Sequence, residues 1–133
     1  MNLKKLQSEL DLTLHDALLR KLSTDFVAGT ADFILDVCVG DPDGKSERER
    51  ERRRAGRLQL TGLQYLAVDP PDPNSPYGDQ SPVRVDPCDA DQEVATRYRI
   101  PDGAFSGRFF VSDWNGFIHF AAAAATLEWL EPE

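Results

Sequence analysis

The chain has few of the residues that build disulfide scaffolds, and it has no long apolar run. Its 133 residues include only two cysteines, Cys38 and Cys88, and no Cys-x-x-Cys pair, so a disulfide framework is not expected. No apolar run approaches the roughly 18 residues that a membrane span needs. The first ten residues lack the apolar stretch of an export signal. We therefore expect a cytoplasmic protein.

Motifs that mark common enzyme classes are also missing. There is no Gly-x-Ser-x-Gly elbow, and Ser106 lies within an expected strand. The nine glycines are scattered at turns and form no phosphate-binding loop. The aspartates between 69 and 91 lack the spacing of a calcium loop. The sequence therefore predicts neither a cofactor nor a metal, and it favours a non-catalytic protein without deciding the question.

The charge is strongly acidic, with a formal net charge of −8 and a pI of about 4.7. A negative surface repels phosphate backbones and favours a cationic partner, so we expect a basic protein partner, no membrane and no nucleic acid. One basic stretch, Lys45–Arg57, carries seven basic and three acidic residues. It lacks the aromatic side chains that stack on bases, so a solvated loop or exposed helical turn is expected there, with RNA or phosphate binding by its arginines as the alternative.

The stretch from Ala104 to Phe120 predicts a β-hairpin at the centre of a sheet. Asn115-Gly116 is typical of a tight two-residue turn, because both residues accept positive φ at low cost. Four of the seven phenylalanines flank this turn: Phe109, Phe110, Phe117 and Phe120. The hairpin is a folding signal and carries no chemistry of its own.

The other elements are predicted from periodicity. Residues 2–10 carry leucines at helical spacing, and residues 32–39 alternate as a strand does. In 17–28 a helix remains an alternative, but the later part, with Phe26 and Val27, favours a strand. Three further strand regions are expected: 57–68 with a bulge or bend near Gly62, 94–100 at an edge, and 121–130 as one long or broken strand.

The length allows one domain, 1–133, with flexible insertions expected at 41–56 and 69–91. Six of the nine prolines fall in the second insertion, which is therefore predicted to be irregular. The predicted fold is mainly β (α+β): a curved antiparallel sheet, barrel-like or sandwich, with a short N-terminal helix. An open sheet of this kind is also compatible with a homodimer.

His15, Asp16 and His119 are the weak candidates for a catalytic or metal site. A metal site would require the two histidines to converge, with Asp113, Asp25 or Cys38 completing the ligands. Nothing in their spacing requires this. Structural hydrogen bonding is the main expectation for both histidines, and a catalytic or metal role is the alternative.

The order of several segments resembles small bacterial β-rich domains of the immunity-protein type. The segments are Leu14-His15-Asp16-Ala17, Leu58-Leu60-Gly62-Leu63, Asp113-Trp114-Asn115-Gly116 and Leu127-Glu128-Trp129. The resemblance implies a small α+β or mainly β domain with an inhibitory binding role, and it brings no catalytic residues. The function expected is a protein-binding, immunity-like interaction module. The alternative is a small metal-dependent or hydrolytic enzyme using His15, Asp16 and His119.

Overall fold

The computed structural model describes residues 3–40, 43–50, 52–89, 93, 96–97 and 99–130. Its elements are α1 (Leu3–Glu9), β1 (Ala17–Asp25), β2 (Thr30–Cys38), α2 (Glu47–Arg50), β3 (Arg53–Thr61), β4 (Tyr65–Val68), β5 (Val83–Cys88), β6 (Phe105–Val111), β7 (Gly116–Ala122) and β8 (Ala124–Trp129). The strands pair antiparallel in one sheet, in the order β4-β7-β6-β5-β1-β2-β3-β8. The predicted antiparallel sheet with a short N-terminal helix is confirmed.

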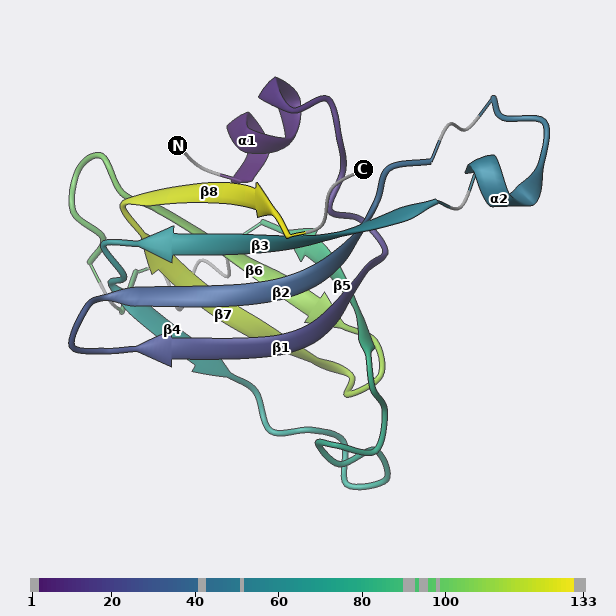
Figure 1. Ribbon diagram of the computed structural model, residues 1–133. Coiled ribbons are helices and arrows are strands. Elements are labelled where there is room, and N and C mark those ends of the chain that lie inside the picture. The colour runs from purple at the N-terminus through teal and green to yellow at the C-terminus, as the bar shows by residue number, and fades with distance from the viewer. Residues whose placement is uncertain are drawn as a thin grey trace.

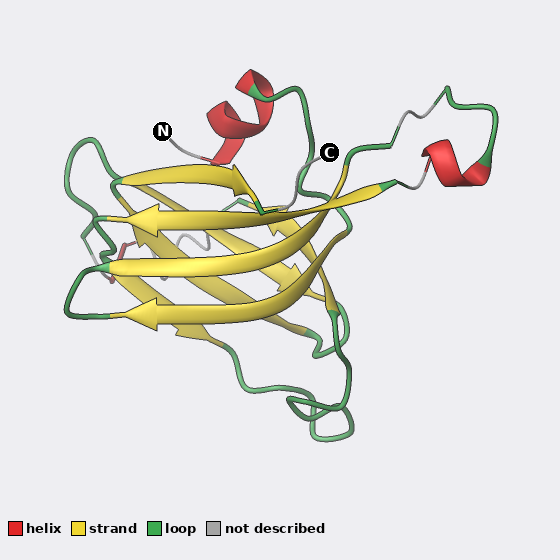
Figure 2. Ribbon diagram, in the orientation of Figure 1, coloured by secondary structure: helices red, strands yellow, loops and turns green. Residues whose placement is uncertain are grey.

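The sheet curves until one half faces the other, which gives a sandwich-like form. Strands β8, β3, β2 and β1 make the layer in front, and β4, β5, β6 and β7 cross behind them (Figure 1). Strands make up the body, and the two helices lie at its periphery (Figure 2). Helix α1 lies beside β8 and contributes Leu3 and Leu6 to the core.

Three phenylalanines form the centre of the core. Phe33 of β2 lies edge-on to Phe109 of β6 and to Phe120 of β7, with ring centroids 5.4 and 6.1 Å apart. Phe109 and Phe120 are themselves 5.5 Å apart, and all three are fully buried. Edge-to-face aromatic contacts add to the hydrophobic gain from burying each ring. This cluster therefore joins the two layers of the sheet.

The bulge or bend predicted near Gly62 is a corner between β3 and β4. These two strands lie near opposite ends of the sheet order. The chain leaves β3 at Thr61, turns at Gly62 with φ +60°, and enters β4 beside β7. A second corner lies opposite at Ala123, whose N–H donates to the backbone oxygens of Thr61 and Gly62 at 3.0 and 3.1 Å. The strand region expected over 57–68 is therefore two strands, with the predicted bend at Gly62 between them, and 121–130 is a broken strand as predicted.

The predicted hairpin exists, but its turn and its position differ from the expectation. Val111 pairs with Gly116, so four residues, Ser112–Asn115, make the loop instead of two. Asn115 supplies the positive φ, at +53°, and Gly116 already belongs to β7. The hairpin also lies toward one end of the sheet order, because β4 pairs with β7 and the central neighbours are β5 and β1.

The prediction that 69–91 is irregular throughout is wrong. Val83–Cys88 form β5, which pairs with β1 through Val85 and with β6 as far as Cys88. Pro87 fits because the pairing with β1 has already ended at Val85. The insertion predicted at 41–56 likewise includes the first four residues of β3.

Two other local predictions also differ from the structure. Strand β1 covers the whole of 17–25, but Phe26 and Val27 lie in the turn that follows it and not in the strand. In the expected edge strand 94–100, Thr96 and Arg97 are helical, and residues 94, 95 and 98 lie outside the described residues. Helix α2 is an exposed helical turn, one of the two predicted forms of the basic stretch.

Candidate functional site

His15, Asp16 and Asp86 form a cluster at the start of β1. His15 Nδ1 lies 2.7 Å from Asp86 Oδ1, and His15 Nε2 lies 3.6 Å from Asp16 Oδ2. Asp86 Oδ1 also accepts the Asp16 N–H at 2.7 Å. Pairing of Ala17 with Val85 brings β5, and with it Asp86, to this place. An imidazole and two carboxylates with ligand atoms within 4.8 Å of one another can bind a metal ion or move a proton.

Two arginines lie next to this cluster. Arg84 Nε is 3.4 Å from Asp16 Oδ1, and Arg53 Nη1 donates to the backbone oxygen of Asp16 at 2.6 Å. The Arg84 N–H donates to Asp113 Oδ2 at 2.8 Å, so the carboxylate of Asp113 holds the backbone of β5. The arginines offset the charge of the carboxylates, and the cluster is not a purely acidic patch.

His119 lies apart from the other two predicted residues. Its Nε2 is 3.0 Å from Asp69 Oδ1, and the side chain is buried in β7. Strands β5 and β6 separate β7 from β1, and at about 4.8 Å per strand the separation is roughly 14 Å. The structure therefore brings His15 and Asp16 together and places His119 with Asp69. The three do not form one constellation.

The residues considered as further ligands have other contacts. Asp25 accepts the N–H groups of Val27 and Ala28 at 3.0 and 2.9 Å, which closes the β1–β2 turn. Cys38 lies in β2 opposite Arg53 and is a free thiol, as is Cys88. Asp25 and Cys38 therefore lie outside the cluster of His15, Asp16 and Asp86.

Asp86 is the member of the cluster that sequence reasoning missed. The prolines of 69–91 predict an irregular loop around Asp86, in which a carboxylate has no defined position. The alternation of Val83, Arg84 and Val85 is a strand signal, and both valines are buried. The surrounding prolines obscured that signal.

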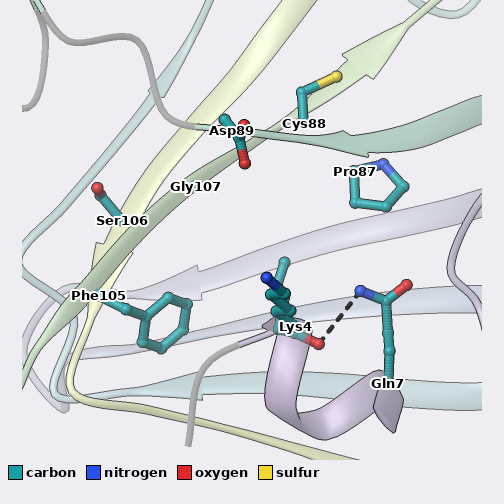
Figure 3. Close-up of a pocket in the computed structure, with 9 residues that line it drawn as sticks. Lys4, Gln7, Pro87, Cys88, Asp89, Phe105, Ser106 and Gly107 are labelled. Atoms are coloured by element: carbon teal, nitrogen blue, oxygen red, sulfur yellow. Dashed lines mark hydrogen bonds between the residues drawn. The ribbon is translucent and has the colours of Figure 1, made fainter.

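A recess lies between α1 and the ends of β5 and β6. It has a volume of about 520 Å³, and Figure 3 shows Lys4 and Gln7 of α1 across from Asp89, Phe105 and Ser106. Gln7 Nε2 donates to the Leu3 backbone oxygen at 3.2 Å, which is a bond within the helix. Because Lys4 and Asp89 are both exposed, the recess is a hydrated surface feature and not an enclosed ligand cavity.

A different end of the molecule exposes apolar side chains. Phe26 and Val27, at the tip of the β1–β2 turn, are 74% and 100% exposed. Phe26 lines a recess of about 270 Å³ together with the start of β4, including Leu63 and Leu66. Val68, at the end of β4, is 39% exposed. We call these five residues, Phe26, Val27, Leu63, Leu66 and Val68, the tip surface.

The tip surface includes an open sheet edge. The Asp69 N–H donates to Phe117 O at 2.9 Å in the register that pairs β4 with β7, so Tyr65 and Ala67 direct their backbone groups toward β7. The N–H and C=O groups of Leu66 and Val68 then point the other way. Within the described residues β4 is the last strand on this side of the sheet order. These two residues can therefore pair with an added strand.

The loop after β4 folds back on the β6–β7 loop. The Tyr77 ring lies edge-on to Trp114 with centroids 4.8 Å apart, and its hydroxyl donates to the backbone oxygen of Asp69. Burial raises the pKa of the Tyr77 hydroxyl, and the negative charge of Asp69 raises it further. The contact fixes the chain where it leaves the open edge.

Three arginines of the basic stretch, in the β2–β3 connection and at the start of β3, contact the protein itself. This connection carries α2 away from the body (Figure 1). Arg50 Nη1 donates to the Gly44 backbone oxygen at 2.9 Å, and the Arg54 guanidinium lies 4.5 Å from the centre of the Trp129 ring. With Arg53 bound to Asp16, three arginines of the basic stretch have contacts within the chain.

No protein family model, curated protein or solved structure matches the chain. Among the described residues, no helix is both long enough and apolar enough to cross a membrane. Evidence for a function therefore comes from the geometry of the chain's own residues.

Proposed function

We propose that this domain is a protein-interaction module that binds an extended, basic segment of a partner protein along the open edge of β4. The observation that carries the proposal is the exposure of Phe26 and Val27 beside that edge. Covering apolar surface gains roughly 25 cal/mol per Å², so a partner that covers both side chains gains affinity from them. Small apolar recesses next to an open edge are a common arrangement for strand addition.

The backbone supplies the second part of the argument. An added strand would hydrogen-bond to Leu66 and Val68, while its alternate side chains face Phe26 and Leu63. The edge is short, because Pro70 and Pro71 follow Asp69 and prolines cannot extend a ladder. Contact with the tip surface therefore contributes to specificity alongside the few backbone bonds.

Charge supports a basic occupant. The segments beside the tip, 22–31 and 61–68, carry one aspartate and no lysine or arginine, and the loop that follows β4, 69–82, carries three more aspartates and again no lysine or arginine. The whole chain has a net charge of −8, so two copies repel each other and a basic segment is attracted. The negative charge therefore favours a cationic partner over a second copy of the chain. It agrees with the inhibitory binding role that the resemblance to immunity proteins implies.

The test uses two labelled peptides of alternating pattern, acetyl-Lys-Val-Lys-Val-Lys-Val-amide and its counterpart with glutamate for lysine. Fluorescence anisotropy is measured at low and high salt. The lysine peptide is expected to bind, with affinity that falls steeply as salt rises, and the glutamate peptide is expected not to bind. The tip variant, which carries F26S and V27S together, is expected to bind the lysine peptide at least tenfold more weakly than the wild type.

L130S is the matched control, because Leu130 is also exposed but lies at the other end of β3, bonded to Ala55. It is expected to bind the lysine peptide as the wild type does. Equal binding by the tip variant, or equal binding of both peptides, would contradict the proposal. Concentration-dependent dimerisation that the tip variant abolishes would identify a second copy as the occupant and would overturn the basic-segment assignment.

A further inference from the structure

His15 is held in one tautomer by its contact with Asp86. The 2.7 Å distance from His15 Nδ1 to Asp86 Oδ1 is that of a charge-assisted hydrogen bond, so Nδ1 carries the proton and donates it. In the neutral imidazole the other ring nitrogen, Nε2, then carries the lone pair. A carboxylate that accepts from one imidazole nitrogen while the other binds a metal is the usual outer-shell arrangement of metal-ligating histidines.

The free nitrogen faces a carboxylate at a distance that suits a shared metal ion. Nε2 of His15 and Oδ2 of Asp16 are 3.6 Å apart. Two ligands at about 2.0–2.1 Å in tetrahedral geometry would be separated by about 3.4 Å. The observed pair therefore needs to move by only a few tenths of an ångström to bind one ion.

We propose that His15 Nε2 and Asp16 Oδ2 form a binding site for a divalent transition metal, with Asp86 orienting the imidazole. One imidazole and one carboxylate suit Zn²⁺, Ni²⁺ or Cu²⁺, whereas Ca²⁺ and Mg²⁺ prefer oxygen ligands alone. The side chains of His15 and Asp16 are 66% and 41% exposed, so water completes the coordination. The site goes beyond the proposed partner binding and does not depend on it.

The backbone holds the two ligands together. Asp16 has a positive φ of +59°, and its N–H donates to the same Asp86 oxygen that accepts from His15. The Asp16 backbone oxygen accepts from Arg53. These bonds fix the main chain on both sides of the Asp16 side chain.

Arg84 opposes metal binding and so provides a specific test. Its Nε lies 3.4 Å from Asp16 Oδ1, the oxygen that does not face His15. A positive charge so close to the ion lowers the affinity by Coulomb repulsion. R84Q is therefore expected to bind metal several-fold more tightly than the wild type, a result that a purely structural role of the cluster would not produce.

The experiment is a calorimetric titration of the full chain, without an affinity tag, with NiCl₂ and then ZnCl₂. One ion per chain is expected for the wild type, with at least tenfold weaker binding in H15Q and in D16N. D86N is expected to weaken binding by about 10–100-fold through loss of orientation. D79N, which changes an exposed carboxylate outside the cluster, is the control and is expected to match the wild type.

A second measurement covers the case in which a variant folds poorly. Paramagnetic Ni²⁺ added to the wild type is expected to broaden the ring signals of His15 and to leave those of the buried His119 sharp. Binding by H15Q equal to the wild type, broadening of both histidines alike, or no binding at millimolar metal would each overturn the proposal.

Discussion

The backbone oxygen of Gly29 accepts the N–H of Leu63 at 2.9 Å, and this bond fixes the β1–β2 turn against the start of β4. The two segments are more than thirty residues apart in sequence. Through this contact Phe26, at the tip of the turn, reaches the open edge of β4 and lines a recess with it. The proposed binding surface is therefore a consequence of the corner at Gly62, which sends the chain from β3 into β4.

Substitution of Gly62 is expected to destabilise the fold. Alanine at this position would have to adopt φ +60°, and its Cβ would lie 2.6 Å from Ala123 Cβ. Left-handed backbone costs about 1–2 kcal/mol and overpacking about 1–3 kcal/mol, so G62A is expected to lose about 2–5 kcal/mol in the free energy of unfolding. Urea denaturation of G62A and of the wild type measures this loss of free energy.

Gly78 offers the matched control for this prediction. It also has a positive φ, +86°, but a Cβ there would meet nothing within 4 Å. G78A is expected to lose only the backbone part, about 1 kcal/mol. Equal losses in G62A and G78A would mean that the contact with Ala123 has no energetic role.

Removal of the Asp69 carboxylate is expected to destabilise the end of β4. Its two oxygens accept the Phe117 N–H at 3.0 Å and contact the buried His119, so D69A leaves partly buried polar groups without partners. The expected loss is about 1–3 kcal/mol in the free energy of unfolding, measured by urea denaturation. D79A, at an exposed aspartate of the same loop, is expected to stay within about 0.5 kcal/mol of the wild type.

Tyr77 is expected to ionise above its ordinary pKa of 10.0, because burial and the charge of Asp69 both disfavour the phenolate. A pKa that is higher in the folded than in the unfolded chain favours the neutral form in the fold. The resulting stability is therefore fully present below about pH 10 and is lost as the pH rises through the folded pKa. Spectrophotometric titration of the tyrosines, compared between wild type and Y77F, measures this ionisation. A Tyr77 that titrates at or below 10 would contradict the account.

Amide hydrogen exchange tests whether the edge of β4 is open. The N–H of Leu66 points away from β7, whereas that of Ala67 donates toward it. Leu66 and Val68 are therefore expected to exchange much faster than Ala67, as read by nuclear magnetic resonance after transfer to deuterated water. Slow exchange at Leu66 would show that another part of the chain covers the edge.

The sequence predicted the layers of the fold better than its corners. Strand 30–38 and helix 3–9 follow from local periodicity, because β2 buries alternate residues along its whole length and α1 buries Leu3 and Leu6 at helical spacing. The corner at Gly62 could not be predicted, because a change of strand partner and a bulge produce the same switch of apolar parity. The β-propensity of Phe26 and Val27 predicts a strand, whereas both lie exposed in the turn, because propensity does not report whether a side chain finds a partner.

The candidate site was half predicted. The adjacency of His15 and Asp16 is visible in the sequence, but Asp86 is 70 residues away and reaches them only through the pairing of β5 with β1. The same strand order places His119 three strands from His15. Side-chain convergence of this kind depends on the strand order, which local patterns do not contain.

The most direct test of the central claim maps where the alternating lysine-valine peptide binds. Amide chemical shifts of the labelled domain are followed by nuclear magnetic resonance as the peptide is added. The account predicts that the largest shifts occur at Leu66, Val68 and the 24–29 turn, and that they vanish in the F26S and V27S double variant. Shifts confined to the 69–82 loop or to the arginines of the β2–β3 connection, or no shifts at millimolar peptide, would contradict it.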